Sequence, residues 1–149
     1  MALGNIFDIA GTGMNAQSLR LNTTASNLAN AQSASSSVNE VYRSRQPVFA
    51  AIQRDAMRAN TVEGTYSDNE VESQVGVQVL GIVESDAPLQ RRYEPDHPKA
   101  DEQGYVYYPN VNPVEEMANM IAASRSFQMN VEVMNSAKQM VQRVLTLGQ

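Results

Sequence analysis

The sequence predicts an α+β fold, with a long helix at each end of the chain and a small β-rich region between them. Apolar residues recur at helical heptad spacing near both ends, whereas valines alternate with other residues in the middle. Charge is divided in the same way, because the two ends are each neutral and the whole net charge of −5 lies between them. We therefore divide the 149 residues into an N-terminal helix (1–31), a central β-rich or irregular region (32–112) and a C-terminal helix (113–149).

The N-terminal helix is predicted from a large apolar residue at every seventh position. A small residue follows four positions after each of the first three, which would let a second helix approach closely. Gly11 and Gly13 each weaken a helix by about 1 kcal/mol relative to Ala, so we expect this helix to depend on packing. The stretch ASNLANA, 25–31, holds Asn27 and Asn30, although asparagine is a poor residue inside a helix. The large positions are Phe7, Met14, Leu21 and Leu28, and the small ones are Gly11, Ser18 and Ala25.

The C-terminal helix is predicted to begin with Asn112 as its N-cap, Pro113 at the first helical position and Glu115 in a capping-box-like place. A helix over 113–147 would be ~50 Å long at 1.5 Å per residue. Two apolar stripes run along it. The first comprises Met117, Met120, Ser124, Phe127, Val131, Met134, Lys138, Val141 and Leu145, and the second comprises Ile121, Val133, Ala137, Met140, Val144 and Leu147.

Two interpretations of these stripes remain open from periodicity alone. They form the core of a helical bundle within one monomer, or they form surfaces that are buried against other chains. The second is favoured because a single partner helix of about 28 residues cannot cover both stripes of the C-terminal helix.

The middle of the chain predicts short strands. PVFAAI at 47–52 begins with a proline, which suits the start of an edge strand. The clearest strand is QVGVQVLGIVES at 74–85, where Val75, Val77, Val79 and Val83 share one face. GYVYYP at 104–109 predicts a short extended piece, and the rest of 86–112 is expected to be irregular.

No pattern of catalytic residues is present. The chain lacks cysteine, so thiolate metal sites are excluded, and no nucleophile elbow, P-loop or dinucleotide-binding motif occurs. The single histidine, His97, stands in a proline-rich turn, and Asp86, Asp96, Asp101 and Glu102 lack EF-hand spacing. The net charge of −5 argues against non-specific nucleic-acid binding. Arginines occur in pairs near acids, which favours a mixed-charge surface over contact with an anionic polymer or a complementary acidic partner. We therefore expect no enzyme, no cofactor, no metal, no nucleic-acid partner, no membrane span and no cleaved signal peptide.

Several stretches resemble the axial rod and hook proteins of the bacterial flagellum. They are LGNIFDIAG (3–11), AQSLRLNTTASNLANAQS (16–33), YEPDHPKADEQGYVYYPNVN (93–112), EEMANMIAASRSFQMNVEVMNSAKQMV and the final LTLGQ. The ASNLANA stretch matches a signature of the whole family, and the proline-rich run with the C-terminal helix is most similar to proteins of the proximal rod. The stretch 54–73 has the poorest match and resembles an insertion.

The resemblance implies a structural subunit that is exported unfolded, without signal cleavage, and assembles helically into the periplasmic rod. In the family the terminal helices pair as an antiparallel coiled coil inside the tube, and the middle faces outward. Its partners would be further copies of itself, the other rod proteins and the ring adaptor of the basal body. The rival interpretation is a monomeric, secreted helical binding module or chaperone. Expected subunit contacts are Phe7, Met14, Leu21, Ala25, Asn27, Leu28, Asn30, Met117, Met120, Phe127, Val131, Met134, Val141 and Leu145.

Overall fold

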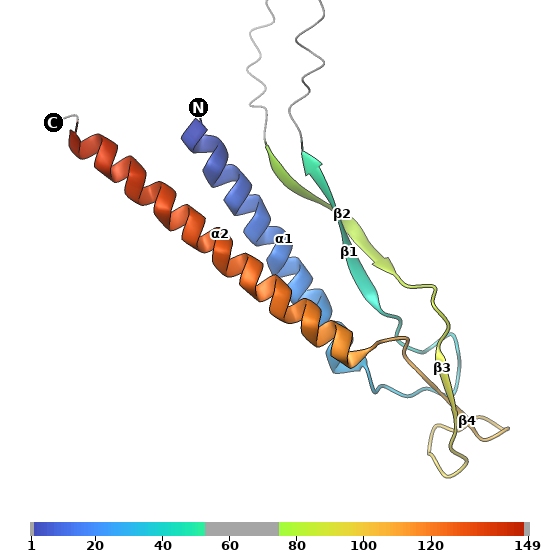
Figure 1. Ribbon diagram of the computed structural model, residues 1–149. Helices are drawn as coiled ribbons and strands as arrows, with labels where there is room; N and C mark the ends of the chain where they lie inside the picture. The colour runs from blue at the N-terminus through green and yellow to red at the C-terminus, as the bar shows by residue number, and fades with distance from the viewer. Residues whose placement is uncertain (1, 53–74, 148–149) are drawn as a thin grey trace, which may run out of the picture.

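The computed structural model of the chain describes residues 2–52 and 75–147 (Figure 1). The expected insertion at 54–73 therefore lies outside the described residues. The predicted α+β class is confirmed, because both helices lie in the terminal ranges and all the described strands lie between them. The helices are α1 (Ala2–Asn30) and α2 (Pro113–Leu147), and the strands are β1 (Arg45–Ile52), β2 (Gly76–Glu84), β3 (Gln90–Tyr93) and β4 (Tyr105–Tyr108).

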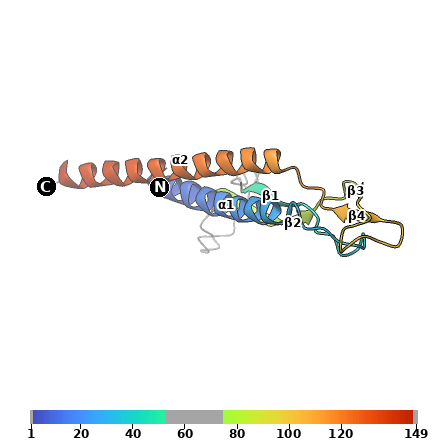
Figure 2. The same ribbon diagram turned by 90° about the horizontal axis from the view of Figure 1, so that it is seen from below.

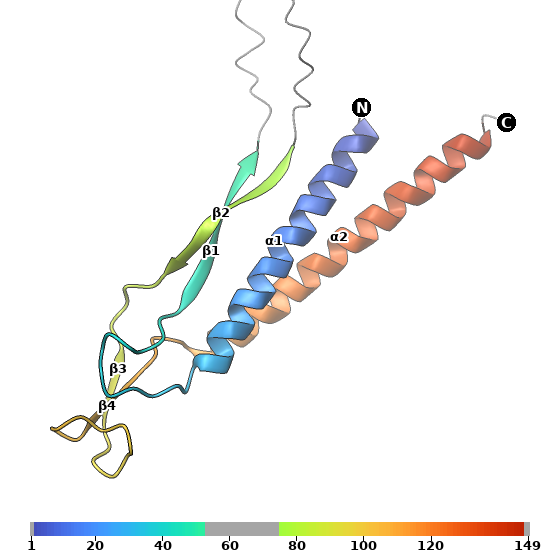
Figure 3. The same ribbon diagram turned by 180° about the vertical axis from the view of Figure 1, so that it is seen from behind.

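Helix α1 is the central element of the molecule. It packs against α2 on one side and against the antiparallel pair β1–β2 on another, whereas α2 packs against no strand (Figures 1 and 3). The smaller pair β3–β4 lies beyond the end of the helices, away from both chain termini (Figure 2). The order α2, α1, β1–β2 leaves the side of α2 that faces away from α1 without a partner among residues 2–52 and 75–147.

The two helices run antiparallel, as contacts at three levels show. Asn27 lies beside Glu116, Arg20 donates a hydrogen bond to Asn119 at 3.1 Å, and Gly13 lies against Asn130. In this register α2 extends past the first residue of α1, as Figure 2 also shows. The last turns of α2 therefore extend beyond the described part of α1.

The predicted large apolar seam is not the centre of the helix contact. Phe7, Met14, Leu21 and Leu28 are only half-buried, and the small residue Ala25 is exposed. The buried positions are small or polar, because these let the two backbones approach closely while the larger side chains are displaced to the flanks. In α1 they are Ala10, Ala16, Thr23, Thr24 and Asn27, and in α2 they are Glu116, Ala123 and Ala137.

The strand predictions at 47–52 and 74–85 are confirmed by β1 and β2. The two strands pair antiparallel from Arg45–Glu84 to Ile52–Gly76, and a β-bulge shifts their register at Val48–Phe49. Thr12 attaches this ribbon to α1, because its Oγ1 accepts a hydrogen bond from the Val77 backbone N–H at 3.2 Å. The extended piece at 104–109 is confirmed by β4.

Strand β3 was not predicted, since 86–112 outside 104–109 was expected to be irregular. All four of its side chains are exposed, so the strand has no alternation of apolar and polar residues that would reveal it. It forms because β4 offers it a full antiparallel register, from Gln90–Tyr108 to Tyr93–Tyr105.

The predicted N-cap at Asn112 and first helical position at Pro113 are also confirmed, whereas no capping-box hydrogen bond of Glu115 is found among the described residues. Asn112 is the N-cap, and its Oδ1 accepts a hydrogen bond from the Val114 N–H at 3.2 Å. Glu115 in the first turn is exposed, whereas its neighbour Glu116 is 5% exposed and points into the molecule.

Two glycines of α1 offer a matched test of the helix contact. A Cβ added at Gly13 would lie 2.9 Å from Asn130 Nδ2, whereas nothing lies within 4 Å of a Cβ at Gly11. Gly13→Leu should therefore lower the free energy of unfolding by about 1–3 kcal/mol through overpacking. Gly11→Ala should raise it by up to about 1 kcal/mol. Urea denaturation followed by circular dichroism measures both, and equal effects would contradict the register.

Candidate site: a polar junction and the uncovered face of the C-terminal helix

Asn27 joins three segments of the chain through its side-chain amide. Its Nδ2 donates hydrogen bonds to the Arg45 carbonyl at 2.8 Å and to Glu116 Oε1 at 2.9 Å. Its Oδ1 accepts from the Tyr42 hydroxyl at 2.8 Å and from the Arg45 N–H at 3.0 Å. The residue is 1% exposed, so these bonds are shielded from water. One side chain thus attaches α1 to α2 and to the first residue of β1.

Glu116 is the acidic partner in this junction. Burial raises the pKa of its carboxyl above the usual value of 4.5, and the nearby Glu115 also raises it. Hydrogen bonds from Asn27 and Ser44 act against this shift by favouring the charged form. Arg20 lowers the pKa through its charge, as the smallest of these effects. The carboxylate is therefore held by neutral donors, and no side chain forms an ion pair with it within the described residues.

A second asparagine extends the junction toward the strands. Asn110 Oδ1 accepts a hydrogen bond from the Ser44 N–H at 2.8 Å, and its Nδ2 donates to the Ser85 and Ala87 carbonyls at 3.1 and 2.9 Å. Ser85 N–H donates to the Ser44 carbonyl at 2.8 Å. The segments that precede β1, follow β2 and precede α2 are therefore held together by amides.

The β3–β4 pair carries stacked arginines and tyrosines on its surface. Arg91 lies 4.2 Å from the ring centre of Tyr105, and Arg92 lies 4.8 Å from that of Tyr108. The Tyr108 hydroxyl donates to Glu94 at 3.0 Å, and this bond raises the pKa of the hydroxyl. Reciprocal backbone bonds between Ser35 and Tyr107, both at 3.0 Å, attach the pair to the segment after α1. These contacts hold the side chains on the surface of the β3–β4 pair in fixed positions.

The acidic side chains of the connecting turn stabilise its backbone. Asp101 Oδ1 accepts hydrogen bonds from the Gln103 and Tyr105 N–H groups at 2.9 and 2.8 Å. His97 Nδ1 accepts from the Lys99 N–H at 3.1 Å, as expected for a residue that packs within a turn. Among the residues that the structure describes, no three histidine, aspartate or glutamate side chains are grouped closely enough to share a metal ion.

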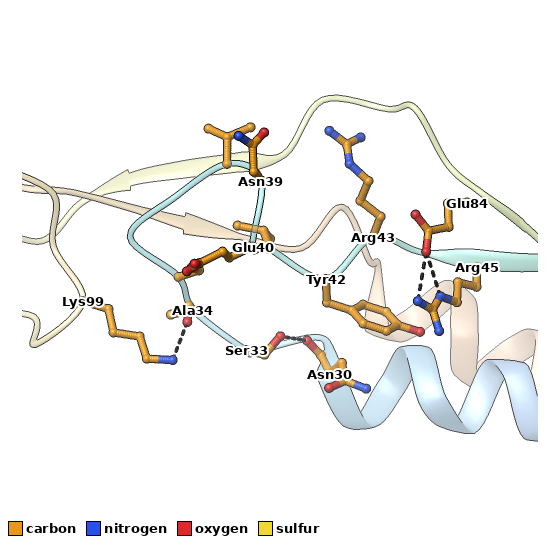
Figure 4. Close-up of a pocket in the computed structure, with 13 residues that line it drawn as sticks. Asn30, Ser33, Ala34, Asn39, Glu40, Tyr42, Arg43, Arg45, Glu84 and Lys99 are labelled. Atoms are coloured by element: carbon orange, nitrogen blue, oxygen red, sulfur yellow. Dashed lines mark hydrogen bonds and ion pairs between the residues drawn. The ribbon is translucent and has the colours of Figure 1, made fainter.

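An open polar cleft of about 680 Å³ lies between the segment 30–45 and the adjoining ends of β1 and β2 (Figure 4). The Arg45–Glu84 ion pair, 2.9 Å, stands at one side of it, and Lys99 donates to the Ala34 carbonyl at the other. The cleft has both charge signs and few apolar atoms.

Helix α2 exposes large apolar side chains along most of its length. They are Val114, Met117, Ile121, Met129, Val133, Met140, Val144 and Leu145, each between 47% and 75% exposed. Soluble monomers rarely present such a row of large side chains to water. Each of the helices described is too short or too polar to cross a bilayer. Within the part of the chain that the structure describes, this exposed row is therefore an extended apolar surface without a partner.

The sequence-predicted contact residues fall into three groups. Asn27 is buried and uses its amide within the chain. Ala25, Met117 and Leu145 are exposed. Asn30, which donates to the Ser26 carbonyl at 2.8 Å, is half-buried, as are the other nine. These nine are Phe7, Met14, Leu21, Leu28, Met120, Phe127, Val131, Met134 and Val141.

Four residues of the junction were not predicted from the sequence: Glu116, Tyr42, Ser44 and Asn110. The available signal was Asn27, whose amide in a nearly uncharged stretch requires polar partners when it is buried. Which residues supply those partners depends on three segments that lie far apart in the sequence. Only the fold therefore shows which residues are the hydrogen-bond partners of Asn27.

Two family models match the two ends of the chain. A model described as "Flagella basal body rod protein" matches residues 7–32, and one described as "Flagellar basal body rod FlgEFG protein C-terminal" matches residues 102–147. Proteins named flagellar basal-body rod protein FlgC from Escherichia coli O6:H1 and Salmonella typhimurium are each 48% identical over 149 residues, covering all of both chains. A protein of the same name from Borreliella burgdorferi is 35% identical over 153 residues, covering 100% of this chain and 99% of its own.

The chain belongs to the FlgC family of flagellar basal-body rod proteins. It is thus a structural rod subunit of the flagellar basal body. The two matched segments of this FlgC-family chain contain α1 from Phe7 onward and α2 up to Leu147, and so include both partners of the Asn27–Glu116 hydrogen bond. The comparisons give no support to a monomeric secreted binding module or chaperone.

Substitutions at Asn27 and Asn30 should show that the buried junction contributes more to stability than the exposed end of α1 does. Asn27→Ala removes one of the two donors to the Glu116 carboxylate, the acceptor of the Tyr42 hydroxyl and the partner of the Arg45 backbone, and each buried group left unsatisfied costs roughly 1–3 kcal/mol. We expect a loss of about 3 kcal/mol or more in the free energy of unfolding. Asn30→Ala removes one exposed bond and should change it by less than about 0.5 kcal/mol. Chemical denaturation of both variants tests this, and similar losses would contradict the central role of Asn27.

Glu116→Gln should change how stability depends on pH. The pKa of Glu116 is higher in the folded state than in the unfolded state. At a pH above the folded-state pKa, the charged carboxyl therefore lowers the free energy of unfolding of the wild type. This loss of stability disappears as the pH falls toward 4.5 and the carboxyl becomes protonated. Glutamine keeps an acceptor for Asn27 and has no charge to bury. The variant should therefore exceed the wild type in stability at pH 7, by a margin that shrinks on acidification.

The difference between the two unfolding free energies, measured at several pH values, isolates Glu116 from the other titrating groups. A difference that stays constant from pH 7 to pH 4, or that favours the wild type at pH 7, would show that the charged form is not disfavoured.

Proposed function

We propose that this chain assembles with copies of itself into the proximal part of the periplasmic rod, a hollow helical shaft that transmits torque. The helix pair α1–α2 forms the inner wall of the shaft, and the strands face outward. Its further neighbours are the other rod proteins and the ring adaptor of the basal body. The chain is exported unfolded without cleavage of a signal peptide, and it performs no catalysis.

The observation that carries this proposal is the incomplete coverage of α2. In the described portion of the chain this helix has a partner on one face only, while eight of its large apolar side chains are exposed. Burial of apolar surface contributes about 25 cal/mol per Å², so a helix of this kind gains stability from neighbouring subunits. Because the chain belongs to the rod family, we expect those neighbouring subunits in the flagellar rod.

The low charge of the two helices supports their place at the inner wall. Residues 1–31 carry one acid and one base, Asp8 and Arg20, and residues 113–149 carry three of each. A wall with few charges offers few strong attachment points to unfolded chains that pass along it. The charged region 32–112 is suited to the outside, where it meets water and other proteins.

Co-sedimentation with basal bodies tests the proposal. The tagged chain is expressed in a strain of its own source that lacks the native copy, and basal bodies are extracted with detergent. The wild-type chain should sediment with them and restore swimming. A chain that restores swimming but stays in the soluble fraction would contradict a place in the rod.

A pair of neighbouring substitutions tests the contribution of the predicted seam to assembly. Leu21 is half-buried and Asn22 is exposed. Leu21→Asp places a charge beside apolar surface, so we expect at least a tenfold loss from the basal-body fraction and loss of swimming. Asn22→Asp should retain both. Circular dichroism of the purified variants separates failed assembly from failed folding, and normal incorporation of the Leu21 variant would rule out a buried seam at this position.

A further inference from the structure

Strand β3 is an edge strand that is paired on one side and open on the other. It pairs antiparallel with β4 along its whole length, and among the described helices and strands it contacts β4 alone. The far side of β4 is occupied differently, because Tyr107 exchanges two backbone hydrogen bonds of 3.0 Å with Ser35. The β3–β4 pair therefore has one covered edge and one open edge, and β3 forms the open edge.

The hydrogen bonds of β4 show how the backbone of Arg91 is turned. Tyr107 directs both its N–H and its C=O at Ser35, and thus away from β3. In an antiparallel ladder two residues that face each other direct these groups either toward each other or away from each other. Arg91 is the partner of Tyr107 in the register. Its N–H and C=O therefore point outward, to the open edge.

The backbone of Tyr93 is turned the same way. Its partner in the register is Tyr105, whose N–H and C=O both bond to Asp101, at 2.8 Å each. The N–H and C=O of Tyr93 therefore also point outward, two residues after those of Arg91. Backbone groups at this spacing are what a further strand needs for pairing, so the open edge of β3 offers a site for strand addition.

The side chains of these two residues lie on one face of β3 and are held in place. The Arg91 guanidinium lies 4.2 Å from the ring centre of Tyr105, and the Tyr93 ring packs edge-on against the same ring at 5.3 Å. Gly104 leaves room for this, since a Cβ there would lie 2.9 Å from the Tyr93 ring. Tyr93 is nevertheless 65% exposed. An added strand would therefore meet a cation and an aromatic ring that are already positioned.

The charges on β3 favour an acidic partner. Arg91 and Arg92 project from opposite faces of the strand, both are exposed, and neither forms an ion pair within the described residues. Glu94 lies on the Arg92 face, where it accepts a hydrogen bond from the Tyr108 hydroxyl at 3.0 Å. The face with Arg91 holds no acid from β3 or β4. The other acids close in sequence lie before β3 or in the turn after it, and they are Asp86, Asp96, Asp101 and Glu102.

We infer that the open edge of β3 takes up an extended, acidic segment of another protein as an additional strand. Backbone hydrogen bonds to Arg91 and Tyr93 hold the segment, and its carboxylate and apolar side chains face these two residues. A second β3 is disfavoured as the occupant, because it would place arginines opposite arginines. The inference concerns the β-rich end of the molecule and does not depend on the place proposed for the helices.

Amide hydrogen exchange of the full chain, measured by NMR, tests this inference at the atoms concerned. The probe is a blocked peptide of seven residues, with threonine at both ends, valine at the second and sixth positions and glutamate at the three between them. Its sequence is the same in both directions, so it suits either strand orientation. One control peptide has lysine in place of glutamate, and another has a methyl group on every interior backbone nitrogen.

In the free chain the N–H groups of Gln90 and Arg92, which face β4, should exchange about tenfold or more slowly than those of Arg91 and Tyr93. The acidic peptide at millimolar concentration should slow exchange at Arg91 and Tyr93 by about threefold or more. Both control peptides should leave the rates unchanged.

Three results would overturn the inference. Slow exchange at Arg91 and Tyr93 in the free chain would show that the edge is already covered within the chain. Unchanged rates with the acidic peptide would show that the edge accepts no strand. Equal slowing by the methylated peptide would reduce the effect to attraction between charges.

A matched pair of charge reversals tests the preference for acidic segments. Arg91→Glu should abolish the slowing at Tyr93 by the acidic peptide and should produce it with the lysine peptide. Arg125→Glu changes the net charge equally at an exposed position of α2, and it should respond as the wild type does. A wild-type response of the Arg91 variant would contradict recognition by charge.

Proline at position 91 tests whether the edge is used in the flagellum. Arg91→Pro removes an N–H that makes no bond to β4, and edge strands accept proline at such positions. Arg91→Ala loses the same side chain but keeps the N–H. In cells that contain only the variant chain, swimming with the proline variant should be about tenfold weaker than with the alanine variant. Equal swimming of the two folded variants would overturn the inference, and if the proline variant fails to fold, the exchange experiment decides.

Discussion

The arrangement of the whole molecule depends on the hydrogen bonds of one buried amide. Asn27 is placed near the end of α1, where α2 begins and β1 starts, and it holds all three through bonds of 2.8–3.0 Å. Because Asn27 and Glu116 occupy matching levels, they set the register of the helix pair. Because the same amide bonds both the N–H and the carbonyl of Arg45, they also set where the β1–β2 ribbon meets α1.

The helix contact above this junction is made of small side chains for a related reason. Ala10 and Ala16 on α1 are buried, Gly13 lies against Asn130 of α2, and Ala123 and Ala137 on α2 are fully buried. Small residues leave little apolar area in the centre of the contact, so the helix pair gains less from burial than a leucine-rich pair would. The larger side chains remain on the flanks, where neighbouring subunits would cover them. A subunit of this kind keeps much of its apolar surface for assembly.

The region around β3 and β4 is stabilised by other interactions than the helix pair. Around β3 and β4 the structure is stabilised by arginine–tyrosine stacking, by backbone bonds to Ser35 and by the carboxylate of Asp101, with Val106 as the one fully buried apolar side chain among these strands. Such a region holds its shape through directional contacts. It is therefore suited to present a defined polar surface on the outside of an assembly, while the helices provide the apolar contacts.

The sequence by itself determined the two helices, the strands β1, β2 and β4, and the cap at Asn112, because these depend on periodicity and local backbone chemistry. It also determined that α2 has more apolar surface than one partner helix covers. Only the tertiary structure decided which face of each helix is buried, since Ala, Gly and Asn carry no strong hydrophobic signal although they allow the closest approach. The partners of Asn27 were likewise decided by the fold, because Tyr42, Arg45 and Glu116 meet only when three distant segments converge.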